Sequence, residues 1–181
     1  MIRALTRYFR RCGRDLARFV AAQQAATAVE FAIIAPVFLA VLLAIFQVSI
    51  FLFVQQSLQN AAMQAGRLFM TGQAQGLSQS AFKNQICQNY LPSVFNCNSL
   101  ILIVQSYPSF AGANTSKPAL YNNGQPITTW AYSPGTQGQI MVVQLVYPWS
   151  VISGPLGFSL SNLPNNAAEM MGVTAFRVEP Y

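Results

Sequence analysis

The chain has 181 residues, of which 53% are hydrophobic and only 8% are charged, and its formal net charge is +6. Beyond residue 54 the charged residues are few and scattered, so we expect no basic face for nucleic acid. The chain contains no histidine, which excludes a Ser-His-Asp triad and histidine-based zinc sites. Most of the positive charge lies in the first 18 residues, where one acid, Asp15, opposes six arginines: Arg3, Arg7, Arg10, Arg11, Arg14 and Arg18.

These arginines lie in a basic leader, residues 1–25. Two interpretations of the leader stay open: a basic helix on the membrane surface, or a tail that only sets the topology.

An uncharged apolar stretch of 24 residues follows at 31–54, with the sequence FAIIAPVFLAVLLAIFQVSIFLFV. As a helix it would be roughly 36 Å long, enough to cross a hydrocarbon core of about 30 Å with some tilt. Arginines beside such a stretch indicate a cytoplasmic N-terminus and a C-terminal domain on the other side of the membrane. A secretory signal peptide is the alternative, but its apolar region is shorter, about 7–15 residues, and ends in a small-residue cleavage site.

The helical pattern continues past the apolar stretch, so one long helix is expected over 26–72. Its last part carries apolar residues at three-to-four spacing, a stripe that needs a cover, and Gly72 is a natural C-terminal stop. A second helix is predicted at 79–90, with Ser78 as its N-cap and Pro92 after its end.

The remaining segments predict β structure. Strands are expected at 100–107, 139–147 and 173–179, with a weaker candidate at 127–132, and long loops at 108–126 and 148–168. The expected fold is therefore α+β: a long transmembrane helix that continues outside the membrane and packs against a small antiparallel sheet. Residues 73–181 would form the exported domain.

The exported segment offers little for chemistry. Its only side-chain carboxylates are Glu169 and Glu179, and no nucleotide-binding or nucleophile-elbow motif occurs. We therefore expect no catalytic, cofactor-binding or metal-binding residues, and we do not expect an enzyme.

Three cysteines are present. Cys87 and Cys97 both lie on the predicted outer side of the membrane, where a disulfide is favoured, and a loop of this size would stabilise the fold by roughly 2–3 kcal/mol. Two free buried thiols are the alternative. Cys12 lies in the leader and is expected to stay reduced.

Glu30 stands at the entrance of the apolar stretch. A carboxylate carried into a bilayer is costly, so Glu30 is either an interfacial residue or one that needs a partner within the membrane.

The residues around this glutamate resemble the processing region of type IV pilin-like proteins. The segment Ala25–Phe31, in the context ATAVEFAIIAPVFL, resembles the TadE-like family, the minor pilin-like proteins of the Tad (tight adherence, Flp pilus) system. Three further segments resemble that family: Ala61-Ala62, Ala65-Gly66-Arg67 with Thr71-Gly72, and the ending Phe176–Tyr181. The family usually has glycine where this chain has Ala25.

The resemblance implies a pilin-like subunit in the bacterial inner membrane, with its C-terminal domain in the periplasm. A prepilin peptidase would cut between Ala25 and Ala26. Glu30 and Phe31 would serve recognition and assembly, and Glu30 would pair with the N-terminal amine of a neighbouring subunit. The implied partners are other pilin-like subunits and the Tad assembly machinery, and the implied roles are adherence, secretion and biofilm formation. A single-pass membrane-anchored binding or scaffold module outside any pilus is the alternative.

Overall fold

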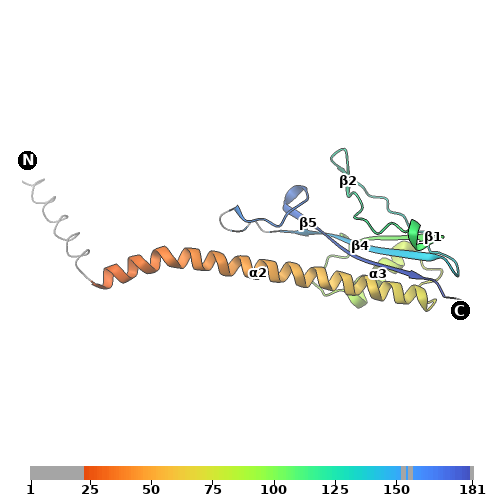
Figure 1. The fold of residues 1–181 in the computed structure, drawn as a ribbon, viewed down its shortest axis with the longest axis horizontal. Coiled ribbons are helices and arrows are strands. Elements are labelled where there is room, and N and C mark those ends of the chain that lie inside the picture. The colour runs from red at the N-terminus through yellow and green to blue at the C-terminus, as the bar shows by residue number, and fades with distance from the viewer. Residues whose placement is uncertain (1–22, 152–153, 155–156, 180–181) are drawn as a thin grey trace, which may run out of the picture. The chain divides into compact units, whose positions relative to one another are not determined.

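The computed structural model describes residues 23–151, 154 and 157–179 (Figure 1). The predictions for the basic leader up to residue 22, including Cys12, lie outside the described residues. The described residues fall into two compact units. The first contains the described residues up to Phe46 together with Gly154. The second contains the other described residues from Gln47 onward, with the whole sheet.

Helix α2 is the long helix that the sequence predicts, and it runs over Gln23–Met70 (Figure 1). Pro36 lies inside it. Proline removes one backbone hydrogen bond, and membrane helices tolerate this loss as a kink. Within the described part of the chain, α2 is the one helix long and apolar enough to cross a membrane. It fits a single-pass membrane anchor.

The C-terminal part of α2 carries a buried stripe. Its spacing of three and four residues places every member on one side of the helix. Each member is at most 6% exposed: Val54, Leu58, Ala61, Ala62, Ala65, Leu68 and Phe69. The helix ends before Gly72, which adopts a positive φ of 75°, and the amide of Ala74 donates to the carbonyl of Leu68. This is the glycine-dependent stop that the sequence indicates.

Helix α3, Gln79–Tyr90, has the predicted bounds. The Ser78 hydroxyl caps it by accepting a hydrogen bond from the amide of Ala81 at 3.3 Å. Its buried face includes Phe82, whose ring lies 4.7 Å from that of Phe69 on α2. The second helix is therefore packed on the stripe of the first.

An antiparallel sheet of three strands covers the stripe, so the α+β prediction is confirmed. The strands are β1 (Ile101–Tyr107), β4 (Ile140–Ser150) and β5 (Ala167–Arg177), in the order β1-β4-β5 (Figure 1). β4 and β5 pair from Ile140 opposite Arg177 to Ser150 opposite Ala167.

The hairpin of β4 and β5 is longer than the sequence predicts. Strands were expected only over 139–147 and 173–179, and the interval 148–168 was expected to be a loop. That loop prediction is wrong at both ends, since β4 runs to Ser150 and β5 begins at Ala167. Pairing with a neighbouring strand overrides the weak β propensity of proline, serine and alanine at these positions.

The weaker strand prediction at 127–132 is also wrong, because no strand is formed there. The segment instead makes one isolated parallel bridge, between Tyr132 and Val104 of β1. The predicted loop 108–126 contains a small hairpin, β2 (Tyr121–Asn122) and β3 (Gln125–Pro126). Asn123 and Gly124 form its turn with φ of 49° and 77°, the conformation that two-residue hairpins favour.

The central strand β4 is buried on both faces. Met141, Val143 and Leu145 belong to the core shared with α2. On the opposite face, the buried Gln144 donates from Nε2 to the carbonyl of Ser116 at 3.1 Å. Part of the loop after β1 therefore covers the face of the sheet that α2 does not, which explains the nearly continuous apolar sequence of this strand.

Candidate functional site

The residues that the resemblance marks for processing lie at the start of α2. Ala25 and Ala26 are in its first turn, since the helix begins at Gln23. Glu30 follows Ala26 by four residues, a spacing that places the two on one side of a helix. Glu30 is exposed and Phe31 is 72% exposed. No described residue forms an ion pair with Glu30.

Between Ile33 and Phe53, large apolar side chains lie all around α2. A helix that is apolar all round belongs in a core or a membrane, and this one is exposed. At least half of each of the following side chains is accessible: Ile33, Ile34, Val37, Phe38, Leu39, Val41, Leu43, Ile45, Phe46, Ile50, Leu52 and Phe53. The surface is therefore suited to lipid or to other apolar helices.

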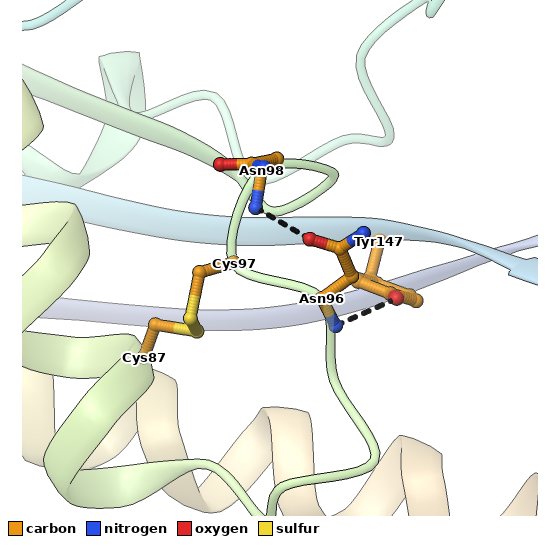
Figure 2. The surroundings of a disulfide bond; sticks show 5 residues. All are labelled: Cys87, Asn96, Cys97, Asn98 and Tyr147. Atoms are coloured by element: carbon orange, nitrogen blue, oxygen red, sulfur yellow. Dashed lines mark hydrogen bonds between the residues drawn. A yellow bond between two sulfur atoms is a disulfide. The ribbon is translucent and has the colours of Figure 1, made fainter.

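Cys87 and Cys97 form a disulfide in the structure, rather than two free thiols (Figure 2). Their Cα atoms are 5.7 Å apart, and Cys87 is only 4% exposed. Next to the bond, the amide of Asn96 donates to the hydroxyl of Tyr147 at 3.1 Å (Figure 2). The amide of Asn98 donates to Oδ1 of Asn96 at 3.0 Å. The bond and these contacts attach the loop after α3 to both α3 and β4.

The sequence predicts that the sheet packs on the long helix, but not the hydrogen bonds that join α2 to β5. Gln55 donates from Nε2 to the carbonyl of Met171 at 2.8 Å. Gln59 pairs with the backbone of Val173 at both ends of its amide: Nε2 donates to the carbonyl at 2.9 Å, and Oε1 accepts from the N–H at 3.0 Å. Two glutamines thus occupy hydrogen-bonding positions on the outer edge of β5. The only sequence signal for these hydrogen bonds is the spacing of the two glutamines, which are four residues apart beside the buried stripe.

The opposite edge of the sheet, along β1, is covered in a similar way. Gln79 donates from Nε2 to the carbonyl of Leu102 at 2.9 Å. The Val104 amide donates to the carbonyl of Ala131 at 3.0 Å, and the Val104 carbonyl accepts from the amide of Ser133 at 2.8 Å. Capped edges discourage the addition of a strand from another chain.

Burial affects two further polar side chains of the domain, those of Tyr132 and Glu169. Tyr132 donates its hydroxyl to the carbonyl of Leu77 at 2.9 Å, and burial raises the pKa of this phenol above its ordinary value. Oε1 of Glu169 on β5 is buried and makes no hydrogen bond with the described residues. Groups of three or more metal-ligating side chains do not occur in the described part of the chain.

A comparison with protein families matches residues 25–67 to the model of the TadE-like protein family. The matched segment begins at Ala25, contains Glu30 and the apolar stretch, and ends at Arg67 within α2, before α3 and the sheet. No curated protein and no solved structure matches the chain. Residues 25–67 are therefore TadE-like, which confirms the resemblance over that segment, whereas Thr71-Gly72 and Phe176–Tyr181 lie outside the match.

Proposed function

We propose that this protein is a pilin-like subunit that takes part in the assembly of a Tad-type pilus. The TadE-like match implies a Tad pilus-associated protein in the membrane. The observation that carries the finer proposal is the organisation of α2. One helix joins the Ala25–Phe31 segment, an exposed apolar surface and a buried stripe that holds the folded domain. A subunit that passes from a bilayer into a fibre needs this combination, since both environments accept the apolar surface.

In this proposal the N-terminus is cytoplasmic and the folded domain is periplasmic. The asymmetry of arginine across the apolar stretch supports this orientation. A prepilin peptidase removes the leader between Ala25 and Ala26, and the Tad machinery and other pilin-like subunits are the partners. The role is non-catalytic and structural, in adherence, secretion and biofilm formation.

Glu30 acts in assembly in this proposal. Cleavage would give Ala26 a new amine, and a carboxylate inside a low-dielectric environment favours pairing with such a positive charge. The pair forms only when neighbouring helices have the correct axial register. Glu30 would therefore select a register more than it would add stability.

The test compares Glu30→Gln with the wild type at equal expression. Glu30→Gln is expected to reach the membrane at the wild-type level, because it removes a charge from an apolar helix, and to lower the number of surface pili. Glu179→Gln is the matched control, since it removes an exposed carboxylate after β5. Membrane level, leader cleavage and pili in electron micrographs are measured for all three chains. Normal piliation of Glu30→Gln at a normal membrane level would contradict the assembly role.

A membrane-anchored binding or scaffold module is the second candidate. It is favoured by Ala25, which stands where the family usually has glycine, because a chain that resists cleavage would stay in the membrane. Deletion of the protein separates the two functions. Loss of surface pili supports the subunit, whereas unchanged pili support the anchored module.

A further inference from the structure

We propose that one end of the folded domain rests in the interface of the same bilayer that α2 crosses. This end, called the hairpin end, is formed by Val94 in the loop after α3, by Trp149 of β4, and by Val151, Phe158 and Leu160 in the β4–β5 connection. The inference rests on the proposed function in one respect, namely that α2 spans a membrane.

The contacts between α2 and β5 determine where the hairpin end lies along the axis of α2. This position is called its level. Gln55 bonds to Met171, Gln59 bonds to Val173, and Gly66 lies against Phe176, so the helix and the strand run in the same direction. β5 begins at Ala167, four residues before Met171, which is about 13 Å of strand. The same distance is about nine residues of helix. Ala167 therefore lies about nine helical residues before Gln55, at the start of the second compact unit.

That level falls within the apolar part of α2. Ile50, Leu52 and Phe53 belong to the same compact unit as the sheet, and each is more than half exposed. If these side chains contact lipid, the hairpin end beside them must reach the membrane surface.

The composition of the hairpin end suits this position. Residues 148–168 contain no charged side chain. Phe158 is 37% exposed and Val94 is 51% exposed. The ring next to Val94, that of Phe95, lies 5.0 Å from Tyr147 and 6.4 Å from Trp149, which places this loop beside the same end of β4. Tryptophan and tyrosine are enriched where protein meets the membrane–water interface.

The distribution of charge points to an apolar contact rather than to an electrostatic one. The charged residue nearest to the hairpin end in the sequence is Glu169, and one of its carboxylate oxygens is buried. Arg177 is eight residues beyond Glu169 along β5, at the opposite end of the sheet. Irregular backbone exposed to lipid would lack hydrogen-bond partners in the hydrocarbon core, so we place the hairpin end in the interfacial layer.

The test places a single tryptophan at chosen sites of the full-length chain in phosphatidylcholine nanodiscs. Trp130 and Trp149 are replaced by phenylalanine, and three chains are made from this background: Phe158→Trp at the hairpin end, Phe110→Trp after the far end of β1, and Phe46→Trp in α2. Phe110 is the matched control because it is 60% exposed, more than Phe158 itself. Lipids brominated near the head-group end of the acyl chain quench tryptophan on contact.

Quenching at Phe158→Trp is expected to be several-fold greater than at Phe110→Trp and comparable to that at Phe46→Trp. Equal, weak quenching at the two domain sites, with strong quenching at Phe46→Trp, would overturn the inference and leave the membrane span intact. Weak quenching at all three sites would overturn the membrane span as well. Protection of Phe158→Trp from an aqueous quencher without quenching by lipid would indicate a protein contact, and would also overturn the inference.

A second pair of variants retains both native tryptophans, in case their loss unfolds the domain. Phe158→Cys and Phe110→Cys in a Cys12→Ser background carry a nitroxide spin label. Collision with lipid-soluble oxygen is expected to exceed collision with a water-soluble nickel complex at residue 158 only. The reverse order at residue 158 would overturn the inference.

Discussion

Substitution of Gly172 by alanine tests the close approach of β5 to α2. A Cβ atom at this position would meet the carbonyl oxygen of Leu58, and would lie 2.7 Å from its carbonyl carbon and 2.9 Å from the amide nitrogen of Gln59. These are backbone atoms of a helix, so the strand and the helix must separate. Gly172 has no positive φ, so the strain would come from this contact and not from the backbone conformation.

The expected loss of stability is about 3 kcal/mol. Overpacking costs about 1–3 kcal/mol, and separation also weakens the three hydrogen bonds made by Gln55 and Gln59, each worth about 1 kcal/mol net. Alanine gives the unfolded chain less conformational entropy than glycine does, which offsets the loss of stability by about 0.4–1 kcal/mol. For a chain of this length the melting temperature should fall by roughly 6–12 °C.

Thermal unfolding of the full chain in a non-ionic detergent, followed by tryptophan fluorescence, measures this effect. Gly112→Ala is the control, because its Cβ would have only the Ser109 hydroxyl oxygen nearby, at 3.9 Å. Gly66→Ala should fall between the two, since its Cβ would meet the Thr174 methyl group at 2.9 Å and alanine favours a helix. A melting temperature for Gly172→Ala equal to that of Gly112→Ala would refute the close approach.

Further predictions concern the covalent state, the topology and the pH response. Cys87 and Cys97 should resist thiol labelling in denatured, unreduced protein, and full labelling of both would show that the disulfide is absent. A reporter active only outside the cytoplasm should be active when fused after Tyr181, and activity of a cytoplasmic reporter there instead would reverse the orientation. Intact mass of the membrane form should show a chain cut after Ala25, and an intact leader would favour the anchored module. Because burial raises the pKa of Tyr132, the unfolded state loses this proton first, so the free energy of unfolding should fall as the pH rises above about 10. Tyr132→Phe should reduce that fall in pH-dependent unfolding experiments, and an unchanged slope would contradict the assignment.

Local sequence determined the two helices and the order of the elements. The stripe from Val54 to Phe69 has helical spacing, and Ser78 marks the start of α3, so both features could be predicted without a structure. The processing segment was also visible, because its residues are neighbours in the chain. Cys87 and Cys97 are ten residues apart, close enough for the pairing to be considered from the sequence.

Only the tertiary structure decided how the sheet meets the helix. Gln59 and Val173 are 114 residues apart, and neither residue type indicates the other as its partner. Gly172 looks like a strand-weakening residue in the sequence, yet the backbone of Leu58 occupies the space of its missing side chain. The extension of β4 to Ser150 and of β5 back to Ala167 likewise depends on pairing between the two strands. Periodicity records which side of an element is buried, whereas the depth of contact and the partner of each edge depend on residues that only folding brings together.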